Sequence, residues 1–269
     1  MTHPDALRAW DEIAPAITDA GECLLLLDYD GTLAPIVPDP EEAFLLPGMK
    51  ELLDELRGIA GVHIAVVSGR ALCDVRLKVG LDVTYAGNHG LEIEGSGIDF
   101  VDKDAKAAAG IVSRICEDLR DAVARIPGAV LEMKGLSASV HFRRVREEDE
   151  GRLAAAVHEA AARYSEQIAV LPGKKILEIR PRVTSHKGTA AQLILQSLSA
   201  GSDVLPVCIG DDLTDEDMFR QFPEGITVRV GRCEDSAAKY CLRGVPEVAE
   251  VLRRIRDLRA NHLRQLRGG

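Results

Sequence analysis

Two acidic side chains stand two residues apart directly after an apolar run. The run Cys23–Leu27 is followed by the segment DYDGT, in which Asp28 and Asp30 carry the carboxylates. One carboxylate of such a pair can attack a phosphorus atom and form an aspartyl phosphate. The other can protonate the leaving oxygen and later take a proton from water. The alternative is an ordinary turn in which the Asp side chains bond to nearby backbone N–H groups.

A second acidic cluster, GDDLTDED at residues 210–217, follows the apolar run Leu205–Gly210. Carboxylates this close together repel one another unless a cation neutralises them. Hard oxygen ligands beside a phosphate site favour Mg²⁺. Asp211 stands where the predicted strand ends and is the candidate metal ligand, whereas Thr214 and Asp217 are typical of a helix cap and an acidic first turn.

Two further motifs are suited to binding phosphate. Ser68-Gly69-Arg70 ends an apolar run and is predicted to open a helix, where a hydroxyl and N-terminal N–H groups can bind an anion; an ordinary helix cap is the alternative. Lys187 opens a later helix and can hold both phosphate and a nucleophile, unless it is a surface lysine. All four motifs fall at the predicted carboxyl edge of one sheet, where α/β proteins bind ligands. Together they predict a phosphate site.

The elements that must position these residues alternate between strands and helices. The predicted strands are almost wholly apolar, which is typical of a parallel sheet buried on both faces. The segment Ala34–Pro47 holds four prolines and is predicted to be a loop. We therefore expect an α/β, doubly wound parallel-sheet core. Its strands are Cys23–Asp28, His63–Ser68, Val83–Ala86 and Leu205–Gly210, and its crossover helices include Met49–Ile59 and Lys187–Leu198.

The middle of the chain has a different pattern. Residues 104–182 predict the order αββαββ, with strand pairs joined by hairpins, so helices should cover one face of an antiparallel sheet. We expect two domains: a parallel core formed by 1–103 and 183–269, and an inserted α+β cap at 104–182. The predicted cap elements are Asp104–Ile126, Ala129–Lys134, Leu136–Arg143, Glu147–Tyr164, Ile168–Leu171 and Lys174–Arg180.

Three of the predicted cap strands alternate between apolar and charged residues. Successive side chains of a strand point to opposite faces of its sheet. Each of these strands therefore has one apolar face for the helices and one charged face, and a solvated outer surface is the ordinary interpretation of the latter. The charged positions are Glu132, Lys134, His141, Arg143, Glu178 and Arg180.

Composition limits the classes of partner and location. The 269 residues include 33 Lys+Arg and 43 Asp+Glu, a net charge of −10, which argues against a nucleic-acid or membrane partner. The apolar run Cys23–Leu27 is too short for a signal peptide or a membrane span. The cysteines at 23, 73, 116, 208, 233 and 241 have no C-x-x-C spacing. We expect reduced thiols in a cytoplasmic protein, and a monomer.

The four motifs, in the order DYDGT, SGR, KG and GDDxTDE, resemble those of haloacid-dehalogenase-type (HAD) phosphatases. The closer resemblance is to the trehalose-6-phosphate phosphatase family, and it covers the chain from about residue 20 to 250. Three further stretches support it: Gly87–Glu92 (GNHGLE), the hairpin from Leu131 to Arg143, and Gly173–Pro181 (GKKILEIRP).

The resemblance implies a role for each motif residue. Asp28 would be the nucleophile and a Mg²⁺ ligand. Asp30 would be the general acid and base and would give its backbone carbonyl to the metal, with Asp211 as the remaining protein ligand. The implied phosphate-binding residues are Ser68, Gly69, Arg70 and Lys187, and Asp212 and Asp215 would orient the metal's waters and Lys187.

The same resemblance implies a substrate. The expected activity is Mg²⁺-dependent hydrolysis of trehalose 6-phosphate, a small sugar phosphate, to trehalose and phosphate through an aspartyl phosphate. Alternatives are another sugar phosphate (mannosyl-3-phosphoglycerate or sucrose 6-phosphate), a phospho-acceptor signalling domain, and a regulatory relative that binds without hydrolysis. The implied sugar-binding residues are His89 in the core and Glu132, Lys134, His141, Arg143 and Glu178 in the cap.

Overall fold

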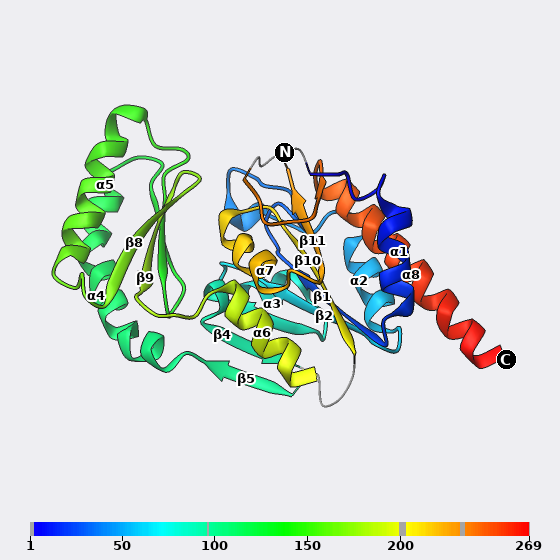
Figure 1. Ribbon diagram of the computed structural model, residues 1–269. Helices are drawn as coiled ribbons and strands as arrows, with labels where there is room; N and C mark the ends of the chain where they lie inside the picture. Colours follow the sequence, from blue (N-terminus) through cyan, green and yellow to red (C-terminus); the bar gives the residue numbers. More distant parts are fainter. Residues whose placement is uncertain (1–2, 96, 199–202, 232–234, 269) are drawn as a thin grey trace. The chain divides into compact units, whose positions relative to one another are not determined.

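The computed structural model describes residues 3–95, 97–198, 203–231 and 235–268, the last six of these by their backbone alone. Its contacts divide the chain into two compact units (Figure 1). The first, here called the core unit, comprises Met1–Phe100 and Ser185–Gly269. The second, the insert unit, comprises Val101–Thr184.

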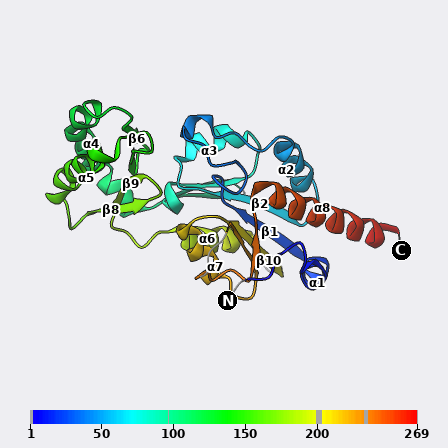
Figure 2. The same cartoon turned by 90° about the horizontal axis from the view of Figure 1, so that it is seen from above.

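The core unit is built on an eight-stranded sheet in the order β12-β11-β10-β1-β2-β3-β4-β5, of which Figure 2 labels β10, β1 and β2. The strands from β12 to β3 are parallel to their neighbours, and β4 runs antiparallel to β3. Their bounds are β1 Glu22–Leu27, β2 Val62–Val67, β3 Thr84–Gly87, β4 Glu92–Gly95, β5 Ile98–Val101, β10 Val204–Gly210, β11 Ile226–Val230 and β12 Tyr240–Leu242.

Helices cover both faces of this sheet, as a doubly wound fold requires. Strand β1 needs cover on both faces because its side chains are apolar on both. Leu25 and Leu27 pack into one hydrophobic cluster, and Leu24 and Leu26 pack into another. The first cluster includes residues of α1 (Trp10–Asp19), α2 (Met49–Arg57), α3 (Leu72–Val79) and α8 (Val245–Gly268). The second includes residues of α6 (Lys187–Leu198) and α7 (Glu216–Gln221).

The predicted α/β class and its central elements are confirmed. The helix α6 has the predicted bounds, and the four predicted strands are found within one residue at each end. Three short 3-10 helices lie in the loops that follow strands or precede helices: η1 Pro40–Glu42, η2 Asn88–Gly90 and η3 Leu213–Asp215. The neighbouring strands β4 and β5, and the strands β11 and β12 at the other end of the sheet, were not among the predicted elements.

The insert unit is a four-stranded antiparallel sheet in the order β6-β7-β9-β8, packed against two helices. The observed order αββαββ agrees with the prediction. Alternate residues such as Leu177 and Ile179 enter a hydrophobic cluster separate from those of the core unit. The bounds are α4 Lys103–Ala124, β6 Val130–Met133, β7 Ala138–His141, α5 Glu147–Ala162, β8 Ile168–Gly173 and β9 Ile176–Pro181.

Within the described part of the chain, no helix has the length and hydropathy needed to cross a membrane. The described cysteines carry free thiols, at positions 23, 73, 116, 208 and 241, and Cys233 lies outside the described residues.

Candidate active site

A buried lysine joins two of the predicted motifs. Asp28 directly follows β1, and its backbone N–H donates to the carbonyl of Ile209 at 3.0 Å. Lys187 is the first residue of α6, and its Nζ donates to Asp28 Oδ1 at 2.6 Å and to Asp215 Oδ1 at 2.7 Å. The lysine is 2% exposed. The fold thus brings residues 28, 187 and 215 together at the carboxyl edge of the sheet, where their motifs were expected to meet.

The loop after β10 fixes the orientation of Asp215. Its Oδ2 accepts a hydrogen bond from the backbone N–H of Asp212 at 2.9 Å, and the Asp212 side chain caps η3 in return. The Cβ of any residue replacing Gly210 would lie 2.3 Å from the Asp215 carboxyl carbon. Both oxygens of Asp215 therefore have partners, one in Lys187 and one in the loop backbone.

The cluster carries more negative than positive charge. Burial raises the pKa of the Asp28 carboxyl well above its ordinary value, and the carboxylates of Asp215 and Asp211 raise it further, against the effect of Lys187. Burial lowers the pKa of Lys187, but Asp215 and Asp28 raise it by more, so that it stays protonated. The repulsion between the carboxylates would be relieved by a cation bound among them.

The geometry fits a divalent cation. Asp28, Asp211 and Asp215 each place a carboxylate oxygen within 4.8 Å of the others. Because Asp215 already bonds Lys187 and the loop backbone, Asp28 and Asp211 are the better placed ligands. Gly31 leaves room for this approach: its φ is 80°, and a Cβ there would lie 2.4 Å from the carboxylate of Asp211. Mg²⁺ is commonly held by one or two protein carboxylates together with substrate phosphate and water, and this donor set suits it.

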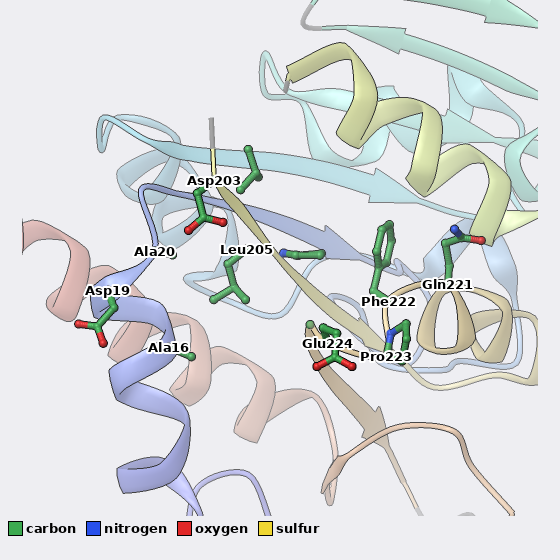
Figure 3. Close-up of a pocket in the computed structure, with 12 residues that line it drawn as sticks. Ala16, Asp19, Ala20, Asp203, Leu205, Gln221, Phe222, Pro223 and Glu224 are labelled. Carbon is green, nitrogen blue, oxygen red and sulfur yellow. The ribbon is translucent and has the colours of Figure 1, made fainter. Parts of the chain in front are cut away.

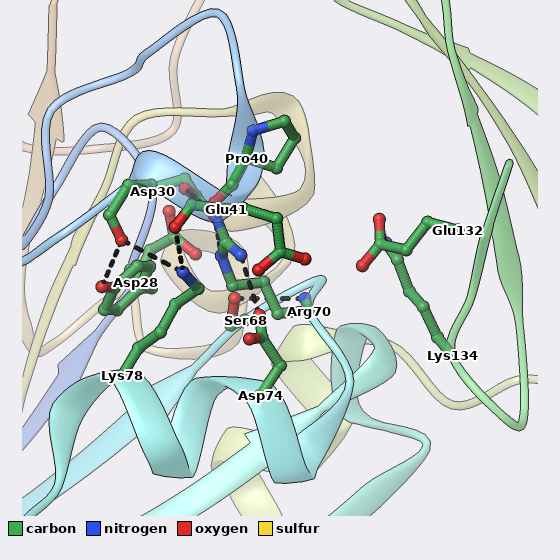
Figure 4. Close-up of polar contacts among 12 residues, drawn as sticks. Asp28, Asp30, Pro40, Glu41, Ser68, Arg70, Asp74, Lys78, Glu132 and Lys134 are labelled. Atoms are coloured by element: carbon green, nitrogen blue, oxygen red, sulfur yellow. Dashed lines mark hydrogen bonds and ion pairs between the residues drawn. The ribbon is translucent and has the colours of Figure 1, made fainter. Parts of the chain in front are cut away.

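The second carboxylate of the first motif, Asp30, is held by Arg70 (Figure 4). Arg70 Nε lies 2.7 Å from Asp30 Oδ2, and Nη2 lies 2.8 Å from Oδ1. The same guanidinium donates to Asp74 Oδ2 at 2.8 Å and to the carbonyl of Pro40 at 2.9 Å. Its carbon Cζ lies 5.2 Å from the centre of the Tyr29 ring. Arg70 was predicted to bind phosphate, and these contacts instead engage it with protein groups.

Ser68 and Gly69 follow β2, but the helix there begins later than predicted. Helix α3 starts at Leu72, so residues 68–70 form a connecting turn and not a helix N-terminus. Ser68 is buried, and its Oγ accepts a hydrogen bond from the backbone N–H of Arg70 at 3.2 Å. A Cβ at Gly69 would lie 2.4 Å from the His89 ring. The hydroxyl of Ser68 therefore remains at the sheet edge, while Gly69 makes room for a histidine.

His89 lies beside this turn in a strained segment. Asn88 and His89 have φ values of 51° and 59°, which are uncommon for residues other than glycine. Their backbone N–H groups donate to the carbonyls of Arg70 and Ser68 at 2.7 and 2.9 Å. Both are buried, and strain of this kind is concentrated at functional sites. The structure therefore places His89 next to the predicted phosphate-binding turn.

The charged face of the insert sheet is centred on Glu132. His141 Nε2 lies 2.7 Å from Glu132 Oε2, and Lys134 Nζ lies 3.8 Å from the same oxygen. Strand register aligns Glu132 with Ser139 and Ser139 with Glu178, so these three positions form a row across β6, β7 and β9. Here we call this group, with Lys134 and His141, the acidic row.

The remaining charged residues of the insert lie around this row. Arg180 Nη1 is 3.8 Å from Glu178 Oε2. Strand β7 ends at His141, so Arg143 lies in the following turn, where it donates to the carbonyl of Lys174 at 3.4 Å. Arg143 was predicted to continue the strand alternation, and the shorter strand removes it from that pattern.

Some residues of the site were not singled out from the sequence. Asp74 stands four residues after Arg70, a spacing typical of ion pairs on a helix. Glu216 is buried, and Arg229 Nη1 donates both to Glu216 Oε1 at 3.2 Å and to the carbonyl of Asp212 at 2.6 Å. The charged residue Arg229 in the apolar run of β11 is the signal that could have revealed this second buried pair.

A pocket of 520 Å³ lies at the opposite edge of the core sheet, by the amino ends of β1 and β10 (Figure 3). It contains none of the motif residues. Its lining comprises Ala16, Asp19, Ala20, Asp203, Val204, Leu205, Pro206, Gln221, Phe222, Pro223, Glu224 and Gly225.

Comparison with known proteins gives consistent results. The sequence model of the trehalose-phosphatase family matches residues 26–246. The trehalose-phosphate phosphatase of Mycobacterium tuberculosis is 37% identical over 271 residues, covering 97% of this chain and 68% of that relative.

Solved structures show the same fold. The C-terminal domain of C. albicans trehalose-6-phosphate phosphatase aligns with a TM-score of 0.81 and 24% identity, over 95% of this chain and 99% of that one. A haloacid dehalogenase-like hydrolase from Bacteroides thetaiotaomicron aligns with a TM-score of 0.61 and 18% identity, over 87% and 99%. The fold is therefore HAD-like, with an inserted cap.

Proposed function

Because this chain belongs to the trehalose-phosphatase family, we propose that it is a Mg²⁺-dependent phosphatase that hydrolyses trehalose 6-phosphate to trehalose and phosphate. The observation that carries this proposal is the buried contact of Lys187 with Asp28 and Asp215, beside the carboxylate of Asp211. It supplies a nucleophile, a fixed positive charge and a metal site within one cluster. Such a cluster suits the transfer of a phosphoryl group, which needs positioning and charge neutralisation.

The first step would form an aspartyl phosphate. An oxygen of Asp28 attacks the phosphorus atom, and the bond from phosphorus to the sugar oxygen breaks with its electron pair on that oxygen. Asp30 gives its proton to the departing oxygen, which leaves as a hydroxyl of trehalose. Lys187 and the Ser68 hydroxyl hold the phosphoryl oxygens during the transfer.

The second step would return the enzyme to its starting state. Asp30, now a carboxylate, takes a proton from water as the water oxygen attacks phosphorus and the bond from Asp28 to phosphorus breaks. We assign Asp28, Asp211 and the backbone carbonyl of Asp30 as protein ligands of Mg²⁺. When bound, Mg²⁺ supplies neutralisation of the charge on the phosphoryl oxygens. Asp212 and Asp215 would orient the metal's waters and Lys187.

Recognition of the sugar is assigned to the insert unit. We propose that residues 104–182 form a substrate-specificity cap and that residues 1–103 and 183–269 form the catalytic core. The acidic row offers carboxylates and an ammonium group, which can hydrogen-bond sugar hydroxyls. Arg143 and His89 are assigned supporting contacts to the substrate. Aromatic stacking is a poor alternative, since the insert holds only Phe142 and Tyr164 as aromatic residues.

The proposal extends to partners and location. We propose that the protein works as a monomer on a small sugar phosphate, without nucleic acid or membrane, in the cytoplasm. The net charge of −10 and the free thiols of the described cysteines support this.

The test is phosphate release by the purified protein with Mg²⁺. Trehalose 6-phosphate would be compared with glucose 6-phosphate, sucrose 6-phosphate and mannosyl-3-phosphoglycerate, with EDTA and Asp28→Asn as controls. We expect a strong, EDTA-sensitive preference for trehalose 6-phosphate. Activity on another member of the panel would overturn the sugar assignment and keep the core chemistry. Binding of trehalose 6-phosphate without any release of phosphate would favour a regulatory protein.

A further inference from the structure

The contacts of Arg70 point to a role that the phosphate-binding motif does not imply. Four hydrogen bonds of its guanidinium go to protein groups: two to Asp30, one to Asp74 and one to the carbonyl of Pro40. Guanidinium carries five N–H groups, so one at most is left for any other acceptor. A phosphate ligand at this position would need to break contacts that are already formed.

The two bonds to Asp30 have the geometry that fixes a carboxylate most firmly. Nε and Nη2 meet the two oxygens separately, at 2.7 and 2.8 Å, and such forked pairs set the plane of the carboxylate as well as its distance. The side chain of Asp30 is 41% exposed, whereas that of Arg70 is 8% exposed. Arg70 is therefore the anchored partner, and the more exposed carboxylate takes its orientation from it.

Arg70 is itself held from three directions. Asp74, on the first turn of α3, lies against Nη1 at 2.8 Å. The carbonyl of Pro40 comes from the loop that follows the first motif. The ring of Tyr29, which is buried and donates to the carbonyl of Ala43 at 2.9 Å, lies under the guanidinium. This surrounding keeps Arg70 in place beside Asp30.

We propose that Arg70 is a positioning residue that aims the carboxylate of Asp30 at the reacting oxygen, and that it is not a ligand of the phosphoryl group. This inference rests on the proposed function, because it takes Asp30 as the general acid and base. It divides the turn at residues 68–70 between two tasks. Ser68 faces the phosphoryl group, and Arg70 serves the neighbouring acid and base.

The test uses p-nitrophenyl phosphate, whose leaving group departs without a proton. If Arg70 serves Asp30, Arg70→Lys keeps the first step and slows the attack of water, for which a base is needed. We expect a rapid burst of about one nitrophenolate per enzyme and then steady-state turnover at least about tenfold below that of the wild type. Asp30→Asn should show the same pattern. A burst lost in proportion to turnover would overturn the proposal, since it would indicate damage to the first step.

A double-mutant cycle separates the two roles of Arg70. In an Asp30→Asn background, Arg70→Lys should change the steady-state rate by less than about twofold, because the residue it positions is already disabled. The inhibition constant of inorganic phosphate should also stay within about twofold of the wild-type value. An equal loss in both backgrounds, with weaker inhibition by phosphate, would identify Arg70 as a phosphate ligand and contradict the proposal.

A second variant guards against misfolding of Arg70→Lys. Asp74→Asn loosens the far side of the guanidinium without touching Asp30, and we expect the same burst with a smaller loss of steady-state rate. The proposal would be overturned if both variants folded and both kept the wild-type steady-state rate. The readouts use an aryl phosphate, so a failure here is distinct from failure to hydrolyse trehalose 6-phosphate.

Discussion

The ammonium of Lys187 lies 2.6 Å from Asp28 and 2.7 Å from Asp215, and all three side chains are buried. Replacing the lysine by methionine would leave two carboxylates in a dry site without a positive partner. Breaking a buried pair in this way costs about 3–5 kcal/mol. We expect Lys187→Met to lose that much stability at pH 7 in urea unfolding, and to lose turnover.

The pH dependence of that loss has a definite sign. Without Lys187 the folded-state pKa of Asp28 would lie further above its unfolded value, because the lysine that lowers it is gone, so this carboxyl would bind its proton more tightly in the folded protein. Stability then falls as pH rises through that interval. The deficit of Lys187→Met should therefore shrink towards pH 5. A deficit of the same size at pH 5 and pH 8 would contradict this account.

A substitution at Asp28 should raise stability, whereas Lys187→Met should lower it. Burial and the neighbouring carboxylates raise its pKa above the ordinary value, so this carboxyl costs stability as pH rises from its unfolded pKa to the raised one, and the full cost remains at higher pH. Asn at this position removes the charge, and Lys187 keeps Asp215 as partner. We expect Asp28→Asn to abolish turnover yet to unfold at a higher temperature than the wild type in EDTA. One kcal/mol corresponds to about 2–4 °C at this length. A clearly lower melting temperature in EDTA would show that the Asp28 contact stabilises the fold.

Single residues also show what the sequence could and could not predict. The approach of Asp28 to the acidic residues after β10 follows from strand ends, because parallel strands bring their carboxyl ends to one edge. The contact of Asp215 with Lys187 was expected only from the family resemblance. The partner of Arg70 does not follow in the same way. The sequence allows its guanidinium either a phosphate or a carboxylate as partner, and the observed contacts involve the loop that carries Pro40, whose path no periodic pattern specifies.

At the scale of elements, the turn after β1 depends on a glycine. Gly31 has φ 80°, and a Cβ there would lie 2.4 Å from the carboxylate of Asp211. Gly48, before α2, has the same φ of 80°, but a Cβ at that position would have no neighbouring atom within 4 Å. Both Gly→Ala changes incur the backbone cost of about 1–2 kcal/mol. Only Gly31→Ala should displace Asp211, weaken Mg²⁺ binding measured by calorimetry and reduce turnover.

The matched control makes this prediction specific. Gly48→Ala should lose stability to a similar degree in urea unfolding and should keep its affinity for Mg²⁺. Equal loss of metal affinity in both variants would show that backbone strain, and not contact with Asp211, is responsible.

The bounds of some helices could be predicted from the sequence pattern, and those of others could not. Helix α6 was predicted with its observed bounds, since a loop precedes Lys187 and apolar residues recur with helical spacing up to Leu198. Helix α3 begins at Leu72 because Ser68 and Arg70 form a turn held by contacts to η2, a segment distant by nearly twenty residues. Long-range contacts of this kind leave no local signal in the sequence.

At the scale of the whole molecule, two units with separate hydrophobic clusters divide the chain. The change between crossover and hairpin connections in the sequence is the reason to expect an insert at residues 104–182. If the core unit performs the chemistry and the insert unit recognises the sugar, their residues should differ in substrate dependence. Residues of the acidic row should affect a disaccharide phosphate far more than an aryl phosphate, whereas Asp28 should be required for both.

Glu132→Gln and Glu178→Gln test this division of work. Each substitution keeps the size of the side chain and removes its charge. Hydrogen bonds to charged groups are worth about 1.5–3 kcal/mol. Losing such bonds to sugar hydroxyls should therefore lower kcat/KM for trehalose 6-phosphate by about tenfold or more. Turnover of p-nitrophenyl phosphate should stay within about twofold of the wild-type value.

The control is Glu150→Gln. Glu150 is a carboxylate of the insert helix α5 that contacts Lys175 at 2.7 Å and lies outside the acidic row. It should leave both substrates unaffected. A parallel fall on both substrates in the Glu132 and Glu178 variants would remove the acidic row from sugar recognition and leave the core chemistry unchanged.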